Sequence, residues 1–181
     1  MIRDDVKKVL FSEEQLTERC RQLGRQITED YRGREDDLIV VGILKGSLPF
    51  FAELIKYIDL AIEIDFMIVS SYEGTETTGS IRISRDLGTN VEGKDVIIVE
   101  DIVDTGLTLS NLTEYIYTEK KARDVQICTL LNKPSRRKQE VDIKYCGFEV
   151  GNEFVVGYGL DYNQKDRNLP FVGVLKEEIY Q

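Results

Sequence analysis

Three short, mostly apolar runs at residues 38–44, 96–99 and 125–131 constrain the fold more than any other feature of the sequence. Strands that are apolar on both faces occur where helices cover both sides of a sheet, and such sheets are mainly parallel. The segments between the runs carry apolar residues at helical spacing, so strands and helices alternate along the chain. This alternation predicts an α/β fold with a mainly parallel, twisted sheet flanked by helices.

Local signals complete the predicted order of elements. Ser12 and Gln15 form a capping box at the start of a helix, and Gly33 ends that helix. A segment with alternating side chains after the polar residues 70–79 is predicted to return as an antiparallel strand. The further expected elements are helices at 48–57 and after 108, strands at 62–69 and 80–86, and shorter strands and loops over 136–181.

Length and charge limit the class of protein. With 181 residues, 41% of them hydrophobic, the chain suits one compact domain with a sizeable core. Its 24 Lys and Arg residues against 33 Asp and Glu residues give a net charge of −9. This charge argues against loose binding to nucleic-acid phosphates and to anionic membranes. We therefore expect neither nucleic acid nor a membrane as a partner.

The residue types that are absent or rare narrow the chemistry further. The chain has no His, which excludes Ser-His-Asp and Cys-His triads, HExxH zinc sites and imidazole general bases. Its three Cys residues form no CxxC pair and fit buried thiols in a reducing compartment. The N-terminus has no apolar run of the signal-peptide kind, and residues 38–44 are too few to span a bilayer. We expect a cytoplasmic protein.

The end of the second apolar run carries the strongest functional pattern. Glu100 and Asp101 follow residues 96–99, and Asp104-Thr105-Gly106-Leu107-Thr108 then leads into a helix. A Gly-containing turn at a helix N-terminus directs backbone N–H groups at an anion such as a phosphate. Neighbouring carboxylates suit vicinal hydroxyls or a divalent cation. The whole pattern predicts a ribose-phosphate site, whereas a lone Asp-Thr-Gly is more simply a solvated turn capped by Thr108.

Two other strand ends carry weaker signals. Lys45 and Gly46 follow the first apolar run and offer a cation and exposed backbone to a second anion, without the spacing of a Walker A loop. Lys133 follows the third run and precedes a Pro. Taken alone, the Lys45 motif fits a helix-opening turn with a solvated Lys equally well, and an exposed Lys before a Pro says little. Ligands of open parallel sheets bind at the carboxyl ends of strands, so we expect these strand ends to form one site.

Residues 99–108 resemble the phosphoribosyl-pyrophosphate signature of the type I phosphoribosyltransferases. The resemblance covers about residues 38–180 and is strongest to members that act on 6-oxopurines. It implies the type I phosphoribosyltransferase fold in one domain, 1–181. The core would lie at about 12–147, and a small hood over the base site would consist of about 148–181 with the N-terminal residues. It also implies a homo-oligomer, a dimer or a tetramer.

The resemblance implies a reaction of purine salvage. The enzyme would use Mg²⁺ and transfer the 5-phosphoribosyl group of phosphoribosyl pyrophosphate to N9 of hypoxanthine or guanine, giving IMP or GMP and pyrophosphate. Asp104 is the expected general base near N7 of the purine, since a chain without His must use a carboxylate or a Lys. The ribose and phosphate would be bound by Glu100, Asp101, Asp104, Thr105, Gly106, Leu107 and Thr108.

The same resemblance assigns the remaining site residues. Pyrophosphate would be bound by Lys45, Gly46 and Arg167, with a cis peptide between Leu44 and Lys45. Ser71 and Tyr72 would lie on a flexible lid. The purine site would contain Lys133, Phe154, Val155 and Asp161, and the metal ligands would be Glu100, Asp101 and Asp161. Leu107 and Asn132 depart from the residues of some family members, and the preference among hypoxanthine, guanine and xanthine stays open.

Several alternatives remain at this point. One is a regulator with the same fold that binds RNA, which the net charge of −9 disfavours. Another is a phosphoribosyltransferase for xanthine, uracil, orotate or adenine, and a third is a nucleotide-binding module without activity. An aspartyl-phosphate phosphatase is excluded because two residues separate Asp101 from Asp104, so the DxDx[TV] spacing is absent.

Overall fold

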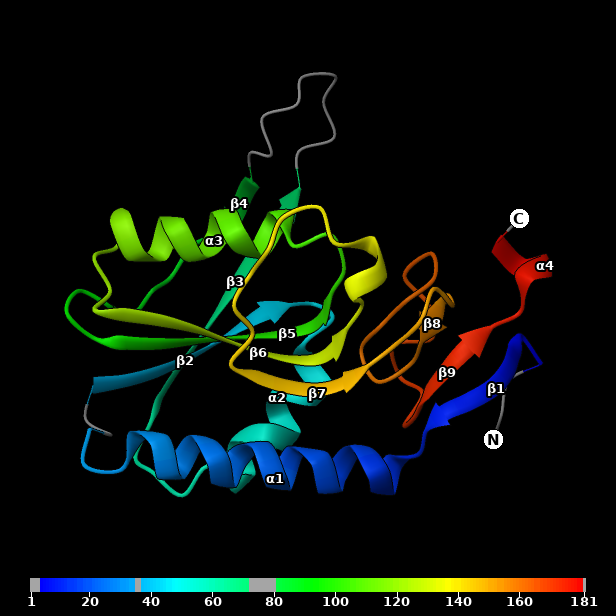
Figure 1. Cartoon of the computed structure of the whole chain (residues 1–181), viewed down its shortest axis with the longest axis horizontal. Helices are drawn as coiled ribbons and strands as arrows, with labels where there is room; N and C mark the ends of the chain where they lie inside the picture. The colour runs from blue at the N-terminus through cyan, green and yellow to red at the C-terminus, as the bar shows by residue number, and fades with distance from the viewer. Residues whose placement is uncertain (1–3, 35–36, 72–80, 181) are drawn as a thin grey trace.

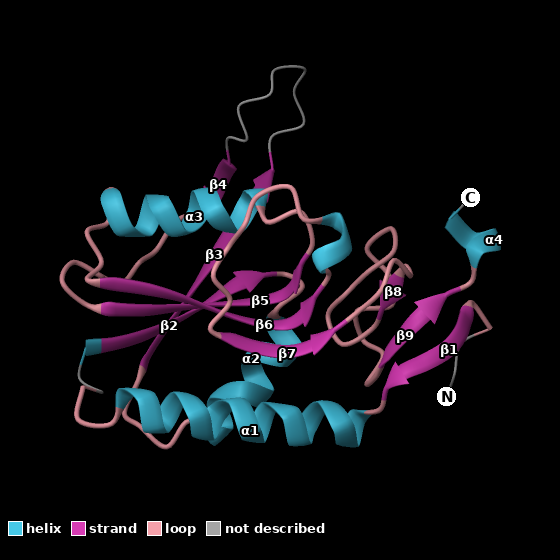
Figure 2. Ribbon diagram, in the orientation of Figure 1, coloured by secondary structure: helices cyan, strands magenta, loops and turns pink. Residues whose placement is uncertain are grey.

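A six-stranded sheet forms the centre of the molecule in the computed structural model, which describes residues 4–34, 37–71 and 81–180 (Figures 1 and 2). Its strands have the order β4-β3-β2-β5-β6-β7, and all neighbours are parallel except β3 and β4. The predicted mainly parallel α/β fold and the antiparallel return strand are both confirmed. The strands are β2 (Leu38–Leu44), β3 (Glu63–Ser71), β4 (Ile81–Arg85), β5 (Asp95–Val103), β6 (Asp124–Asn132) and β7 (Tyr145–Glu149).

Helices cover the two faces of this sheet. Helix α1 (Glu13–Tyr31) and helix α2 (Leu48–Leu54), which continues as the 3₁₀ turn η2 (Ile55–Tyr57), lie on one face. Helix α3 (Leu107–Thr118) lies on the other. The predicted capping box at the start of α1 is present, since the Ser12 hydroxyl accepts from the Gln15 N–H and the Gln15 side chain accepts from the Ser12 N–H.

The central sheet has an apolar layer on each face, because the side chains on both faces of its inner strands are buried. Along β2, Val40 packs with the α1 and α2 side, whereas Ile39 and Val41 pack with the α3 side. Neighbouring side chains of a strand point to opposite faces, so an uninterrupted apolar run is required when both faces are covered. From α3, Leu109 and Ile116 complete the second layer.

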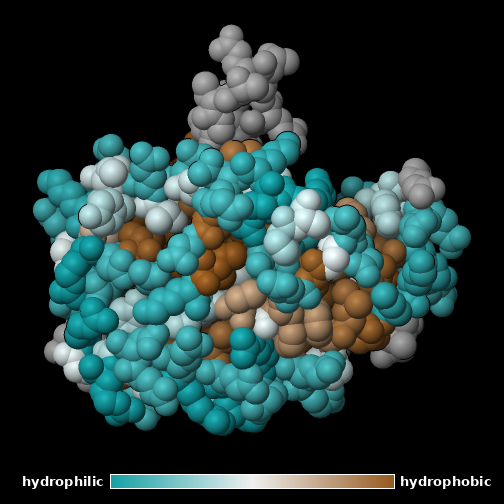
Figure 3. All heavy atoms as spheres, viewed as in Figure 1, coloured by the Kyte–Doolittle hydropathy of each residue, from teal (hydrophilic) through white to brown (hydrophobic). Residues whose placement is uncertain are grey.

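A second, antiparallel sheet joins the two ends of the chain. Strand β9 (Val172–Leu175) lies between β1 (Val6–Phe11) and β8 (Val155–Val156), and the short helix α4 (Glu177–Tyr180) follows it. This small sheet lies at the end of the central sheet where β6 and β7 end (Figure 2). Phe11 stacks on Phe148 of β7 at 4.1 Å between ring centroids, and apolar residues gather near this junction in Figure 3.

Three predicted boundaries were wrong by a few residues. Strand β5 continues to Val103, because Ile102 and Val103 still pair with β6, so Glu100 and Asp101 lie in the strand rather than after it. Strand β3 includes Ser71, which pairs with Ile81 of β4 instead of lying in the polar loop. Helix α3 begins at Leu107 with Gly106 as its N-cap, so Thr108 is not the cap.

The cysteines behave as the sequence predicts. Cys20 and Cys128 are buried, Cys146 is partly buried, and none forms a disulfide. Burial raises the pKa of the Cys20 thiol to about 12, so this thiol stays protonated. Among the helices that the structure describes, none is long and apolar enough to cross a membrane.

Candidate active site

The carboxyl ends of β2 and β5 meet at the point where the strand order reverses, which is where open α/β sheets bind ligands. The backbone at Gly46 touches the Asp101 carboxylate so closely that a Cβ on Gly46 would lie 1.7 Å from Asp101 Oδ2. A Cβ on Gly159 would lie 1.9 Å from the Gly46 carbonyl oxygen. The segments that carry Gly46, Asp101 and Gly159 therefore meet here, and the close approach is possible because two of the three residues are glycines. The peptide between Leu44 and Lys45 is cis, a feature that the family resemblance implies and the sequence itself leaves open.

Glu100 and Asp101 form a pair of adjacent carboxylates at this meeting point. Burial raises the pKa of Glu100 well above its usual range, and the charge of Asp101 adds to the effect. Burial also raises the pKa of Asp101, although the Ile102 N–H donates to Asp101 Oδ1 at 2.7 Å. Such carboxylates become more stable as anions when a cation or hydroxyl donors lie beside them.

The oxygen-rich pair fits a hard divalent cation that the substrate helps to bind. Mg²⁺ is usually held by one or two carboxylates, waters and substrate phosphates rather than by a complete cage of protein ligands. Within the described parts of the chain, no three or more His, Cys, Asp or Glu residues cluster closely enough to hold a metal by themselves. Glu100 and Asp101 thus suit a metal that arrives with a phosphorylated ligand.

A hollow of about 180 Å³ lies where β5 passes into α3, lined by residues 100–106, 108 and 109. Gly106 makes the turn with φ of 82°, in the left-handed region that favours glycine. A Cβ at Gly106 would lie 2.1 Å from the Gln139 carbonyl oxygen, so the position has no room for a side chain. The first-turn N–H groups of α3 and its dipole favour an anion in this hollow.

Asp104 has one paired and one unpaired carboxylate oxygen. Its Oδ2 lies 3.4 Å from Arg136 Nη1 in an ion pair. Its Oδ1 is buried and accepts no hydrogen bond from the residues that the structure describes. A buried acceptor without a donor is costly in the free protein, and a ligand N–H at this oxygen would satisfy it.

A second hollow, of about 230 Å³, brings residues from three parts of the chain together. It contains the carboxylates of β5 and the following turn, the Lys after β6, and residues from and after β8. Its walls consist of Asp101, Ile102, Asp104, Lys133, Arg136, Phe154, Val155, Leu160 and Asp161.

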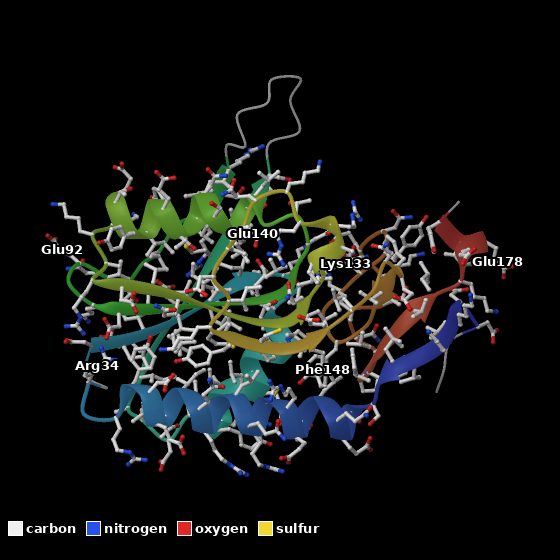
Figure 4. The ribbon with its side chains drawn as sticks, in the orientation of Figure 1. Arg34, Glu92, Lys133, Glu140, Phe148 and Glu178 are labelled. Carbon is white, nitrogen blue, oxygen red and sulfur yellow. The ribbon has the colours of Figure 1, made fainter. Side chains whose placement is uncertain are left out.

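Lys133 is buried at the end of β6, between the central sheet and the segment that carries β8 (Figure 4). Its Nζ donates to the Glu153 carbonyl oxygen at 2.9 Å, and its backbone N–H donates to the Val103 carbonyl oxygen. Burial lowers the pKa of Lys133, and the nearby Asp104 charge opposes that change. The interpretation of Lys133 as an exposed turn residue is therefore wrong, because its ammonium group reaches into the protein.

Phe154 and Val155 line the same hollow as Lys133. Phe154 is partly buried, and its ring meets Tyr162 edge-on at 5.6 Å and stacks with Tyr180 at 5.0 Å. Val155 begins β8 and pairs with Val174 of β9, which fixes its backbone. The lining of the hollow therefore includes an aromatic residue and ordered backbone.

Asp161 and Arg167 belong to a polar network beside the same hollow. Arg167 Nη2 lies 2.7 Å from Asp161 Oδ1, and Arg167 Nη1 donates to the Gly159 carbonyl oxygen at 2.7 Å. The Gln164 side-chain oxygen accepts from both Lys45 Nζ at 3.4 Å and Arg167 Nη2 at 3.2 Å. The two cations from opposite ends of the chain therefore converge on Gln164.

The structure thus brings most of the predicted site residues into one region, with two exceptions. Ser71 lies at the end of β3 and lines neither hollow, and Tyr72 lies outside the described residues. Arg136 and Gln164 were not predicted. Arg136 follows the Lys133 motif closely and could have been suspected as a second cation. Gln164 has no sequence signal, because only the fold brings it to Lys45.

Comparison with known proteins identifies the family. The profile described as "Phosphoribosyl transferase domain" matches residues 10–163. The chain is 52% identical over 181 residues to the hypoxanthine-guanine phosphoribosyltransferase of Streptococcus pneumoniae, with 99% of each chain covered. It is 51% identical over 178 residues to that of Staphylococcus aureus, with 98% of each covered.

A solved structure agrees with these relatives. The crystal structure of a hypoxanthine phosphoribosyltransferase from Staphylococcus aureus matches with a TM-score of 0.92 and 51% identity. The match covers 98% of this chain and 96% of the other. Together with the strand-end hollows, these similarities show that the chain belongs to the phosphoribosyltransferase family, among its hypoxanthine-guanine phosphoribosyltransferases.

Proposed function

We propose that this protein is a purine-salvage enzyme. It transfers the 5-phosphoribosyl group of phosphoribosyl pyrophosphate to N9 of hypoxanthine or guanine, and the products are IMP or GMP and pyrophosphate. The observation that carries the proposal is the 230 Å³ hollow, in which Asp104, Lys133 and Phe154 face one space beside Asp101. An acceptor, a donor and an aromatic face are what a planar base with an oxo group and ring N–H groups requires.

Lys133, Phe154 and Val155 bind the base in this proposal. The Lys133 ammonium group donates to the 6-oxo oxygen, a hydrogen bond that is strong because the donor is charged and buried. The Phe154 ring stacks on the purine, and the backbone of Val155 contacts the edge of the base. An amino group at position 6, as in adenine, cannot accept from Lys133, which favours 6-oxopurines.

Asp104 acts on the proton at N7 of the purine. Its Oδ1 has no donor among the described residues, and so it is available to accept the N7–H while N9 bonds to C1′ of the ribose. Arg136 lies at Oδ2, so the second oxygen, Oδ1, faces the base. Asp104 thus fills the role of general base in a chain that has no His.

The other predicted residues bind the sugar and its phosphates. Glu100 and Asp101 hold the ribose hydroxyls, and the turn at Asp104, Thr105, Gly106, Leu107 and Thr108 holds the 5′-phosphate. The departing pyrophosphate contacts Lys45, Gly46 and Arg167. Ser71 and Tyr72 belong to a lid that excludes water during transfer.

Mg²⁺ is the proposed cofactor, with Glu100, Asp101 and Asp161 as its protein ligands. When bound, the ion supplies positive charge that neutralises the leaving pyrophosphate. Asp161 is engaged by Arg167 and by the Gln164 N–H, so it would share its oxygens between these donors and the metal.

We also propose the organisation of the molecule. Residues 148–181 with the N-terminal strand form a hood over the base site, and residues of about 12–147 form the core. The exposed side chains of Leu48, Ile64 and Ile68 offer apolar area that a second copy would bury, which supports a homodimer or homotetramer. Light scattering on the purified protein tests the oligomer. The net charge and buried thiols support a cytoplasmic location.

The test of the reaction offers hypoxanthine, guanine, xanthine, adenine and uracil separately, with phosphoribosyl pyrophosphate and either Mg²⁺ or a chelator. We expect turnover of hypoxanthine or guanine that depends on Mg²⁺. Asp104→Asn removes the base and should greatly lower kcat. Failure of the wild type to use any purine would contradict the proposed function, whereas an unimpaired Asp104→Asn variant would contradict only the role of Asp104.

A further inference from the structure

The ring of Phe154 is held by two other aromatic rings. Tyr180 of α4 stacks on it, with 5.0 Å between the centroids and 24° between the ring planes. Tyr162 meets it edge-on, with 5.6 Å and 87°. Stacked and edge-to-face arrangements are both favourable for aromatic pairs. The position and tilt of the Phe154 ring are thus fixed by two residues that do not line the base hollow.

Tyr180 contacts Phe154 from outside the base hollow. Phe154 lines that hollow, but Tyr162 and Tyr180 do not. Lys133, at the hollow, and Glu178, on α4, lie on opposite sides of the segment that carries β8 (Figure 4). A purine that enters the hollow would therefore reach the inner face of Phe154, while Tyr180 covers the outer face.

Helix α4 is itself anchored beside Phe154. The Tyr162 hydroxyl donates to the Ile179 carbonyl oxygen at 3.0 Å. The Leu175 N–H donates to the Phe154 carbonyl oxygen at 2.9 Å, which ties the strand before α4 to the aromatic residue. The Lys176 N–H donates to the Asp5 carbonyl oxygen at 2.9 Å. Because of these bonds, Tyr180 has a fixed place and can restrain the ring it covers.

We propose that Tyr180 is a positioning residue for base binding: it stacks on the outer face of Phe154 and holds that ring parallel to an incoming purine. The inference rests on the proposed function and extends it to the last helix of the chain. An aromatic side chain that is ordered before binding loses less conformational entropy when the ligand arrives, and this increases affinity for the base. The effect concerns the base alone, because the phosphate and ribose residues lie on β5 and α3.

The test compares Tyr180→Ala, Tyr180→Leu and Tyr180→Phe by steady-state kinetics with each substrate varied in turn. Loss of an aromatic pair should raise KM for hypoxanthine and guanine by about 2- to 10-fold, with kcat and the KM for phosphoribosyl pyrophosphate near wild-type values. Tyr180→Leu keeps apolar bulk in the hood but not a flat face, so it should show the same defect. Tyr180→Phe keeps the ring and should behave as wild type.

A matched control variant and the wild-type enzyme distinguish failure of the Tyr180 proposal from failure of the proposed function. Tyr117→Ala removes an exposed tyrosine on α3 and should leave both KM values unchanged. An unchanged KM for the base in Tyr180→Ala, or a Tyr180→Leu variant equal to wild type, would contradict positioning by stacking. A loss of thermal stability with unaltered KM values would also contradict it. If the wild type itself shows no transfer to a purine, the proposed function fails instead.

Discussion

At the scale of single residues, the burial of Lys133 is what suits it to bind a base. Lys133 is 5% exposed, and its Nζ already donates to the Glu153 carbonyl oxygen. A Lys in an exposed turn would be strongly hydrated, and the cost of removing that water would offset much of the hydrogen-bond energy gained on binding the base. In this hollow the ammonium group meets a substrate oxygen with little competing water, which strengthens the hydrogen bond.

Lys133→Met tests this role directly. The thioether keeps most of the bulk but cannot donate, so we expect kcat/KM for hypoxanthine to fall by about 10- to 100-fold, the value of a hydrogen bond from a charged group. The KM for phosphoribosyl pyrophosphate should change little. Lys138→Met, at an exposed position in the next turn, is the matched control. Equal base kinetics in wild type and Lys133→Met would remove Lys133 from base recognition.

At the scale of elements, the turn from β5 into α3 is the most constrained part of the site. Gly106 combines a φ of 82° with a neighbouring carbonyl oxygen of Gln139 that leaves no room for a Cβ. The N–H groups of Lys138 and Gln139 both donate to the Thr105 carbonyl oxygen, so the turn cannot shift freely. An added methyl group must therefore distort the anion site.

Gly106→Ala is expected to raise the KM for phosphoribosyl pyrophosphate strongly. Gly33→Ala is a matched control, since Gly33 has a φ of 81° but no heavy atom within 4 Å of the added Cβ. The left-handed backbone should cost both variants about 1–2 kcal/mol of stability, and Gly106→Ala should lose more because its Cβ meets the Gln139 carbonyl oxygen. Only Gly106→Ala should alter substrate kinetics. If the two variants bind phosphoribosyl pyrophosphate equally well, the turn is not the phosphate site.

At the scale of the whole molecule, a buried carboxylate that lines neither hollow ties strand β3 to the segment between β4 and β5. Asp65 of β3 accepts hydrogen bonds at Oδ2 from the backbone N–H groups of Gly88 at 2.7 Å and Thr89 at 2.9 Å. Burial opposes ionisation of Asp65, but these N–H donors outweigh it and lower its pKa. A lowered pKa in the folded state stabilises the fold above the pKa of an unfolded Asp, about 3.9.

Asp65→Asn should therefore reduce stability at neutral pH, and the difference from wild type should shrink as the pH falls through the lowered pKa of the folded state. Urea unfolding of both proteins between about pH 2 and pH 7 measures this difference. Asp142→Asn is the control for loss of an exposed carboxylate. A difference that stays constant or grows toward acid pH would contradict the account of Asp65.

The fold could be predicted from the sequence because its signals are local. The apolar run at β2 needs both faces covered, and the Ser12 capping box marks the start of α1. The residues at the strand ends could be found for the same reason. By contrast, the burial of Lys133 and the convergence of Lys45 and Arg167 on Gln164 depend on segments far apart in the chain. No local pattern encodes such contacts.

The most direct test of the central claim is a mass balance of the wild-type reaction by ³¹P NMR. Phosphoribosyl pyrophosphate, Mg²⁺ and hypoxanthine are mixed with the protein, and the 1-pyrophosphoryl resonances are followed. The account predicts that they disappear while free pyrophosphate and the 5′-phosphate of IMP appear in equal amounts, and that guanine gives GMP in the same way. Persistence of phosphoribosyl pyrophosphate with both bases, or its hydrolysis without nucleotide formation, would contradict the account.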